Sequence, residues 1–325
     1  MATSGTIATT TINTATLIEH SLLRARVPLS SQSPEIIQKA QENLYFLLLG
    51  MSNNGLNLWC VDKGFIGLNE GQATYSLPKG TLDVLNVVHS QPTIASSTFS
   101  AITNGGKAQS SNSPSIVRIG WQFNAAYTGT LTISHSADDV TYTQMLSIAS
   151  DTYSAGQWYY ADLPAAVNGS FVTLTGTAAP VSAISLIITS YDMPVSQWNR
   201  DTWAVMNNKD RKSHPATNYF FEKKIVSKIT LWPVPDSSLN YIMFYRHRQI
   251  QDVGSLTQEL EIPARWMEGI IWQLAMRIVF EMPEADTNLI QLISTMADKH
   301  EFEAELGETD GSTISISPGI RGYSR

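Results

Sequence analysis

Apolar residues recur with the spacing of an α-helix in two stretches of the chain, residues 36–51 and 259–282, which lie roughly two hundred residues apart. In each stretch they fall three or four positions apart and form one broad apolar face. A face this wide has to be buried against another apolar surface. We therefore predict that the two helices pack together as the core of the fold. The apolar positions of the later helix are Trp266, Ile270, Ile271, Leu274, Ile278 and Val279.

The residues that flank both stretches are typical of helix ends. Ser33 and Pro34 suit the N-cap and first position of the earlier helix, and Gly55 follows its end. Pro263 suits the first position of the later helix, where its missing N–H costs nothing, and Pro283 ends it. Further helices are expected over residues 14–26, 195–206 and 284–306, the last with an acidic outer face.

Alternating apolar and polar residues predict short strands on both sides of a long middle segment. Residues typical of turns separate them, among them residues 62–64 and 233–236. The expected strands are residues 56–61, 73–77, 82–89, 218–221, 228–232 and 241–247.

The middle segment, residues 91–190, is rich in Thr, Ser, Gly and Ala and contains few charged residues. Its short strand-like pieces are separated by turn residues and no stretch has helical spacing, which indicates a β-sandwich. Other element types flank it on both sides, so we expect an inserted domain whose ends lie close together. Its predicted strands are residues 115–123, 129–134, 144–148, 157–163, 171–175 and 183–189.

The predicted fold class is therefore α+β. It combines a helical core and small antiparallel β elements with an inserted all-β sandwich of jelly-roll or galactose-binding-like type. The expected parts are a mobile N-terminal arm (1–13), a discontinuous core (14–90 and 191–306), the inserted sandwich (91–190) and an extended C-terminal arm (307–325).

Composition describes a folded protein, because 43% of the 325 residues are hydrophobic and only 15% are charged. No apolar run approaches the roughly eighteen residues needed to span a membrane. The first residues lack the basic region and apolar segment of a signal peptide. Cys60 is the only cysteine, which excludes an internal disulfide and a thiolate metal cluster and agrees with assembly in a reducing compartment.

The net charge of −7 hides a division along the chain. Residues 200–250 are mainly basic, whereas residues 251–310 are mainly acidic. Two such blocks suit contacts between neighbouring copies of one chain, although two ordinary solvated surfaces give the same pattern.

No motif for catalysis, metal binding or cofactor binding stands out. The six histidines are scattered and none belongs to an H-E-x-x-H pair. The chain also lacks a complete phosphate-binding loop and a G-x-S-x-G nucleophile turn. We therefore expect no enzyme, no metal and no cofactor.

Four weaker candidates have both a functional and a structural interpretation. Asp138 and Asp139 resemble a carboxylate pair, but adjacent hairpin residues point apart and favour a turn. Tyr153 and residues 158–160 suit a stacking platform for sugars or bases, whereas strand alternation favours core packing. His247, between two arginines, indicates a charged strand edge. The basic loop 209–212 suits phosphate, but no aromatic residues are interleaved with it.

Several segments outside the middle of the chain resemble the head-to-tail adaptor proteins of short-tailed bacteriophages, also called tail tubular protein A or gatekeeper-type proteins. The resemblance covers residues 14–90 and 191–306. It is carried by Leu231-Trp232-Pro233-Val234-Pro235-Asp236, Tyr241, Tyr245, residues 249–252, 259–263 and 265–266, and by Asn199-Arg200-Asp201, residues 207–209, Pro215, Tyr219-Phe220, Gly71 and residues 75–78.

The middle segment is similar to galactose-binding-like, discoidin-type sandwiches. The residues that carry this similarity are 132–134, 136–139, 141–143 and 158–163. Val140 stands where these domains usually have a turn glycine, which puts the ligand-binding loop in question but leaves the sandwich unaffected.

The adaptor resemblance implies a structural protein of the virion tail or neck, assembled in the bacterial host cytoplasm. Its partners would be further copies of itself in a ring of about twelve, the portal protein, the tail nozzle protein and DNA passing through the lumen, with no membrane. Because a conduit should not grip phosphate, we expect the acidic C-terminal helices to contribute more to the channel than the basic block. The candidate contacts with other copies or the portal are Lys209, Arg211, Lys212, Arg246, Arg248, Glu259, Glu261, Arg321 and Tyr323.

Two alternative functions remain open at this point. In the first, the inserted sandwich binds or depolymerises carbohydrate as part of a tail protein. In the second, the basic block contacts DNA during packaging. Ring formation would support the adaptor. Glycan affinity would support the first alternative, and salt-dependent duplex binding would support the second.

Overall fold

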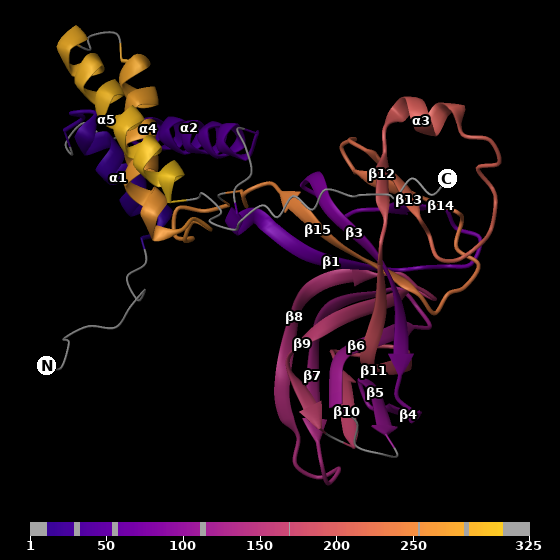
Figure 1. Cartoon of the computed structure of the whole chain (residues 1–325). Coiled ribbons are helices and arrows are strands. Elements are labelled where there is room, and N and C mark those ends of the chain that lie inside the picture. The colour runs from indigo at the N-terminus through magenta and orange to yellow at the C-terminus, as the bar shows by residue number, and fades with distance from the viewer. Residues whose placement is uncertain are drawn as a thin grey trace, which may run out of the picture. The chain divides into compact units, whose positions relative to one another are not determined.

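The computed structural model describes residues 12–28, 33–53, 58–110, 115–168, 170–252, 254–282 and 286–307. The chain forms two compact units: a helical unit from residues 1–60 and 249–325, and a β-rich unit, Val61–Arg248 (Figure 1). Most of the predicted arms, including Arg321 and Tyr323, lies outside the described residues.

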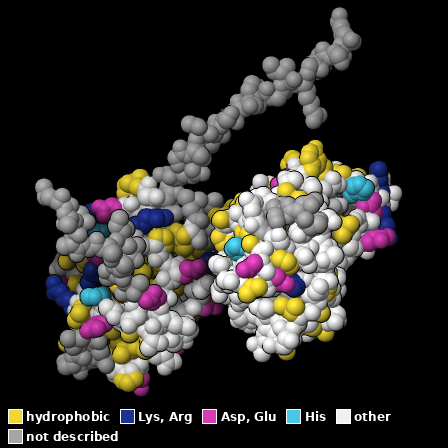
Figure 2. All heavy atoms as spheres, turned by 90° about the horizontal axis from the view of Figure 1, so that it is seen from below, with side chains coloured by type: hydrophobic (Ala, Val, Ile, Leu, Met, Phe, Trp, Pro, Cys, Tyr) yellow, Lys and Arg dark blue, Asp and Glu magenta, His cyan; other side chains and the backbone are white. Residues whose placement is uncertain are grey.

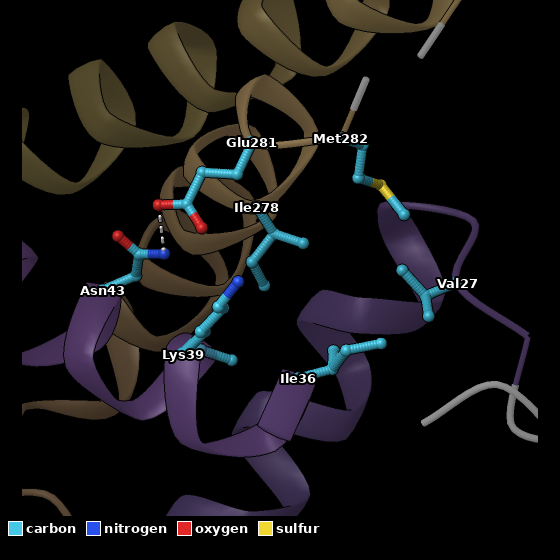
Figure 3. Close-up of a pocket in the computed structure, with 8 residues that line it drawn as sticks. Val27, Ile36, Lys39, Asn43, Ile278, Glu281 and Met282 are labelled. Atoms are coloured by element: carbon cyan, nitrogen blue, oxygen red, sulfur yellow. Dashed lines mark hydrogen bonds between the residues drawn. The ribbon is translucent and has the colours of Figure 1, made fainter. Parts of the chain in front are cut away.

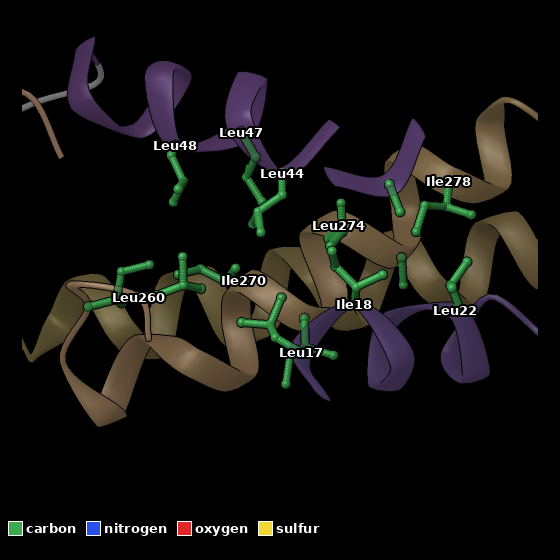
Figure 4. Packing of buried hydrophobic residues seen from close by; sticks show 14 of the residues in the cluster. Leu17, Ile18, Leu22, Leu44, Leu47, Leu48, Leu260, Ile270, Leu274 and Ile278 are labelled. Atoms are coloured by element: carbon green, nitrogen blue, oxygen red, sulfur yellow. The ribbon is translucent and has the colours of Figure 1, made fainter. Parts of the chain in front are cut away.

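The helical unit is built from the two ends of the chain. Its helices are α1 (Thr14–Arg24), α2 (Pro34–Asn53), α4 (Ala264–Phe280) and α5 (Thr287–Leu306), with a short 3-10 turn, η2 (Leu58–Cys60). Helix α4 packs against the other three helices. Figure 4 shows Ile270 and Leu274 of α4 between the leucines of α2 and the apolar side chains of α1. The predicted pairing of the two long apolar helices is confirmed, and α1 covers a further side of α4.

Helix ends follow local capping chemistry. Asn13 accepts a hydrogen bond from the Thr16 N–H at the start of α1, and Asp286 does the same for the Asn288 N–H of α5. Pro263 precedes α4 as its N-cap, with ψ of 144°, and is not the first helical residue as predicted. Helix α5 begins at Thr287, later than the predicted residue 284, and residues 283–285 are outside the described part.

The β-rich unit contains three sheets and one short helix, α3 (Arg200–Val205). The strand orders are β1-β15-β3-β11-β6-β9, β4-β5-β10-β7-β8 and β12-β13-β14-β2. Their bounds are β1 Val61–Gly67, β2 Thr74–Ser76, β3 Thr81–Ile94, β4 Ser97–Ile102, β5 Gly105–Ser110, β6 Ser115–Phe123, β7 Tyr127–Ser136, β8 Thr143–Tyr153, β9 Trp158–Asn168, β10 Phe171–Thr175, β11 Val181–Pro194, β12 Ser196–Trp198, β13 Asn218–Glu222, β14 Lys228–Trp232 and β15 Tyr241–Arg248.

The α+β fold with a β-sandwich is confirmed. The five-stranded sheet packs on β6, β9 and β11 around one apolar core, which includes Ile119, Phe123, Leu131 and Val172. On the face in Figure 2, the β-rich unit, at the right, is covered mainly by atoms that are neither charged nor hydrophobic. This agrees with the low charge of the middle segment.

The sandwich is not set apart from the strands that flank it. Strands β3 and β11 run through the predicted domain boundaries at residues 91 and 190 and pair with each other across them. The six-stranded sheet therefore joins strands of the predicted insert to β1, β3 and β15. The predicted discontinuous core also divides differently, because its strands and the short helix α3 belong to the β-rich unit, whereas α1, α2, α4 and α5 form the other unit.

Strand β1 replaces the turn predicted at residues 62–64. Asp62 pairs with Arg246 and Gly64 with Phe244 in antiparallel register. A Cβ on Gly64 would lie 2.5 Å from the Phe244 ring, so the glycine allows close packing in a strand and does not mark a turn. Within the predicted strand at residues 56–61, Leu58–Cys60 form a 3-10 turn and Val61 begins β1.

Two further predictions differ. Residues 195–206 are not one helix: β12 pairs in parallel with β13, and α3 starts only after Asn199, whose side chain accepts from the Thr202 N–H. Strands β4 and β5 were not predicted, because Ser, Thr and Gly residues conceal their alternation. Gly106 lies beneath the Phe99 ring and the Val181 side chain, where a Cβ would come within 3.0 Å of both.

Candidate functional site

Three tryptophans from separate elements form a row on the four-stranded sheet. Trp198 comes from β12, Trp203 from α3 and Trp232 from β14. The Trp198 ring centroid lies 6.4 Å from that of Trp203 and 5.3 Å from that of Trp232. Trp203 also stacks on Phe220 of β13, with an interplanar angle of 3°. All three indoles are partly exposed, so the row is accessible from solvent.

Two cations lie over the ends of this row. The Lys209 Nζ is 5.4 Å from the Trp203 ring centroid, and the Arg211 guanidinium carbon is 5.9 Å from that of Trp232. Both distances are within the range of cation–π attraction. We call Trp198, Trp203, Trp232, Lys209 and Arg211 the tryptophan surface.

Local hydrogen bonds hold the loop that carries the two cations. The Trp232 indole Nε1–H donates to the Asn208 carbonyl at 3.2 Å. The Val234 N–H donates to the Arg211 carbonyl, and the Ser213 N–H donates to the Val234 carbonyl. Lys212 reaches Glu70, with a 3.8 Å separation between exposed groups. The loop is therefore positioned by backbone contacts on both sides of its basic residues.

The geometry favours an anionic partner that does not stack. Phe220 and Lys209 both contact the Trp203 ring, and Arg211 lies over Trp232, so the indole faces are already engaged. Arg211 is exposed, and Lys209 is partly exposed with its Nζ donating to the Ala204 carbonyl at 3.5 Å. The side chain of Val205, the residue after Ala204, is 80% exposed. Carboxylates beside an apolar group would satisfy both features.

The structure separates the other predicted contact residues. Arg246 and Arg248 both reach Asp62, at 3.4 and 2.7 Å, and their side chains are only 13% exposed. Arg246 also donates to the Thr81 hydroxyl, and burial lowers the pKa of its guanidinium. Glu259 is exposed and forms an isolated β-bridge with Asn13, whereas Glu261 is half-buried. Their role in contacts between copies stays a prediction.

Asp138 forms a turn, as predicted. Its carboxylate accepts from the Val140 and Thr141 N–H groups and the Ser136 hydroxyl, which lower its pKa to about 2. The neighbouring Asp139 points to other partners: Lys107 lies at 2.7 Å and the Tyr142 hydroxyl donates to it. The two carboxylates therefore do not face a common substrate position.

The aromatic residues near β9 pack inward. Tyr153 and Tyr159 contact each other and Phe123 in the sandwich core. Tyr160 lies 4.5 Å from Tyr241, and burial raises the pKa of its hydroxyl. These contacts confirm core packing as the role of this cluster.

A buried polar cluster occupies the inside of the six-stranded sheet, whose edge strands β1 and β9 lie against each other. The Arg118 guanidinium lies between the rings of Phe65 and Tyr241, at 4.5 and 5.1 Å. It donates to Asp162 at 2.6 Å and to the Tyr241 hydroxyl. Lys63 also pairs with Asp162. These groups form hydrogen bonds and ion pairs with one another, so the cluster offers no free acid, base or nucleophile.

His247 lies inside the sheet and not at a strand edge, because β15 runs between β1 and β3. Burial lowers the pKa of its imidazole, and it lowers that of His89 to about 4. His214 contacts the Asp236 carboxylate at 2.9 Å on the surface. Among the described residues, no three His, Cys, Asp or Glu side chains are placed to hold a metal ion.

A pocket of about 140 Å³ lies in the helical unit (Figure 3). Val27, Ile36 and Ile278 supply apolar walls, while Asn43 donates to Glu281 at its rim. This lining offers a place for an apolar group and no nucleophile–base pair. None of the described helices has both the length and the apolar character to cross a membrane.

No family model matches the chain, and no curated protein matches it. Three solved structures share part of the fold. One, a "CBM32-1 from a family 31 glycoside hydrolase" of Clostridium perfringens, is 14% identical over 37% of this chain and 98% of that domain, with a TM-score of 0.23.

The other two cover similar shares. "CpGH89CBM32-6" of Clostridium perfringens is 12% identical over 32% of this chain and 93% of that domain (TM-score 0.20). The "CBM32 of AlyQ in complex with 4,5-unsaturated mannuronic acid" is 14% identical over 35% of this chain and 97% of that domain (TM-score 0.19). The β-sandwich itself is defined by the strand pairing and the shared apolar core of this chain.

Proposed function

We propose that the chain is a structural subunit of a short-tailed phage virion, a head-to-tail adaptor. In this role it forms an oligomeric ring between the portal and the tail nozzle, with DNA passing through the lumen. The ring holds about twelve copies, as the family resemblance implies. The proposal assigns the chain no catalytic residue and no cofactor.

The observation that carries the proposal is the exposure of large apolar side chains on the helical unit. Phe46 of α2, Phe280 of α4 and Phe302 of α5 are 55%, 63% and 61% exposed, and Leu292 of α5 is 53% exposed. We infer that these side chains belong to a surface that a partner protein covers, because contiguous exposed apolar patches mark such surfaces. A ring subunit has such surfaces on two sides, because each copy contacts two neighbours.

The segments that resemble the adaptor family also form one connected structure. Strand β2, with Tyr75 and Ser76, pairs with β14, which pairs with β13. The Gly71 N–H donates to the Pro235 carbonyl at 2.8 Å. Residues of the resemblance that lie roughly 150 positions apart are thus hydrogen-bonded neighbours, which supports their interpretation as one structural motif.

Imaging tests the proposal. Purified chain is mixed with the portal protein of the same phage and viewed by negative-stain electron microscopy. We expect closed rings of about a dozen copies seated on the portal. The double variant Phe280→Ser with Phe302→Ser should form fewer rings. Its circular dichroism spectrum should match that of the unmodified chain, which shows that the variant is folded. Chains that never associate with the portal or with one another overturn the proposal.

A second candidate function is glycan binding by the sandwich, and one cluster favours it. Lys107, Asp139 and Tyr142 lie together on the five-stranded sheet, and the Lys107 Nζ is 5.5 Å from the Phe171 ring. Charged and hydroxyl groups beside an aromatic ring are the groups that hold a sugar. Calorimetry with acidic and neutral oligosaccharides tests it: Lys107→Ala should abolish binding, and absence of binding by the unmodified chain rules it out.

A further inference from the structure

A second surface, on α5 of the helical unit, carries the acidic and apolar groups that a partner of the tryptophan surface would need. Asp298, Phe302 and Glu305 are spaced four and three positions apart and therefore share one face of the helix. All three are exposed. Over the part of the chain that the structure describes, neither Asp298 nor Glu305 has an ion-pair partner. Two further acids, Glu308 and Asp310, follow in the sequence.

We infer that the tryptophan surface of one copy binds this acidic face of α5 in a second copy. The inference rests on the proposed function, because it names the contact that joins neighbouring subunits. Lys209 and Arg211 pair with Asp298 and Glu305, and Phe302 packs against Val205 and the exposed edges of the indoles. The contact is heterologous: each copy uses its tryptophan surface toward one neighbour and its α5 toward the other.

The two surfaces present the same order of groups. Along α5, Phe302 lies between Asp298 and Glu305, which are about 10 Å apart. On the tryptophan surface, a cation lies over each of Trp203 and Trp232, and Trp198 contacts both of these indoles. The pattern of charge, apolar group and charge is therefore the same on both sides.

The observations favour this partner over DNA. Phosphate would pair with Lys209 and Arg211 but would place the apolar Val205 side chain against a charged group. Single-stranded bases would need free indole faces, whereas Trp203 and Trp232 already carry a cation and Trp203 also stacks on Phe220. An acidic helix with an exposed phenylalanine would pair with both cations, cover Val205 and need no free indole face. Helix α5 of this chain is such a helix.

Charge reversal tests the contact in the full chain. Lys209→Glu with Arg211→Glu, and separately Asp298→Lys with Glu305→Lys, should each weaken self-association and ring formation about tenfold or more. A chain with all four changes should recover association. An equimolar mixture of the two double variants should also recover it, because alternating copies restore an opposite-charge pair at every contact.

The matched control is Lys223→Glu with Lys224→Glu, which changes the net charge equally in the β13–β14 turn, at the opposite end of these strands from Trp232, and should leave association unchanged. Circular dichroism and thermal unfolding confirm that each variant is folded. The inference is overturned if the charge-reversed variants assemble as the unmodified chain does, or if only duplex DNA binding responds to Lys209 and Arg211. Rings that persist in these variants would leave the proposed function standing.

Cysteine pairing gives a second measurement that does not need a complete ring. The native Cys60 is fully buried, so Val205→Cys and Phe302→Cys introduce the reactive thiols. Mixing the two single variants under mild oxidation should give a disulfide-linked heterodimer, at least tenfold more than either variant forms alone. If no heterodimer forms even at high protein concentration, the contact does not exist.

Discussion

The two units bury different chemistry. The core of the helical unit is almost entirely apolar, and its ion pairs, such as Arg24 with Glu268, lie at the surface. The β-rich unit buries polar groups as well, including Arg118, His89 and His247. The helical unit also exposes phenylalanines, while the β-rich unit exposes a row of cations on indoles. We conclude that the helical unit gains its stability from apolar packing. The β-rich unit also buries polar groups, of which Arg118 is paired, whereas the Nε2 atoms of His89 and His247 have no hydrogen-bond partner among the described residues.

The largest effect is expected from a cavity in the helical core. Leu274 is fully buried at the centre of α4, so Leu274→Ala should lower the free energy of unfolding by about 2–5 kcal/mol. The matched control, Leu292→Ala on the exposed face of α5, should change it by less than about 0.5 kcal/mol. Thermal unfolding followed at 222 nm measures both. An equal loss in the two variants would mean that Leu274 does not pack as described.

The next effect is a pH dependence of the β-rich unit. Burial lowers the pKa of His89 to about 4, with a smaller contribution from His214 in the same direction and an opposing one from Asp236. In the unfolded chain the pKa of this histidine is near 6.5. Between pH 4 and pH 6.5 the unfolded chain therefore binds a proton that the folded chain does not. Stability is thus full above pH 6.5 and falls by about 3 kcal/mol as the pH drops to 4.

His89→Gln provides the matched variant for this dependence. Glutamine has no proton to gain in this range, and its carbonyl can replace the imidazole Nδ1 that accepts from the Ala216 N–H at 3.4 Å. Denaturant unfolding at several pH values should show a flatter profile for the variant. His247, whose pKa burial lowers in the same direction, accounts for a residual slope. An unchanged profile would contradict the assignment to His89.

Arg118 tests the buried polar cluster. Arg118→Ala removes the partner of Asp162 and the contact between two rings, so we expect a loss of about 2–3 kcal/mol. The expected loss is smaller than for a fully buried pair, because the Asp162 side chain is 38% exposed and still forms its ion pair with Lys63. Arg118→Met should lose less, since it retains the aliphatic packing. Equal stability of all three chains would show that the cluster contributes nothing.

The smallest effect is expected at the surface pair of the helical unit. Arg24 and Glu268 lie 2.7 Å apart, with side chains 25% and 48% exposed. Glu268→Ala should therefore cost less than about 1 kcal/mol, and the cost should shrink further at high salt. A loss as large as that of Arg118→Ala would remove the difference between the two units.

Sequence patterns predicted the helices well because their faces are wide and their ends are marked by capping residues. Strands β6, β10 and β14 were predicted with the observed bounds, because each is a short apolar and β-branched run that ends at polar or turn residues, and each has a buried centre. Strands β4 and β5 were missed because pairing, and not their own polar residues, places them in the sheet. Gly64 was read as a turn residue, whereas its role is to make room for Phe244.

The candidate site was harder to predict than the fold. The basic loop 209–212 was visible in the sequence, but the aromatic residues that support it come from positions 198, 203 and 232, on three different elements. Only strand pairing brings these together. The same limit applies to Arg246 and Arg248, whose common partner Asp62 lies on a strand that the local sequence did not indicate.

Imaging of the chain with its portal tests most directly whether these surfaces build an assembly. Unmodified chain at increasing concentration is mixed with portal rings, and the particles are counted by negative-stain electron microscopy together with mass photometry. We predict closed rings of about a dozen copies on the portal, lost in Phe280→Ser with Phe302→Ser and unchanged in Lys223→Glu with Lys224→Glu. Chains that remain monomeric beside empty portals at every concentration contradict the adaptor function.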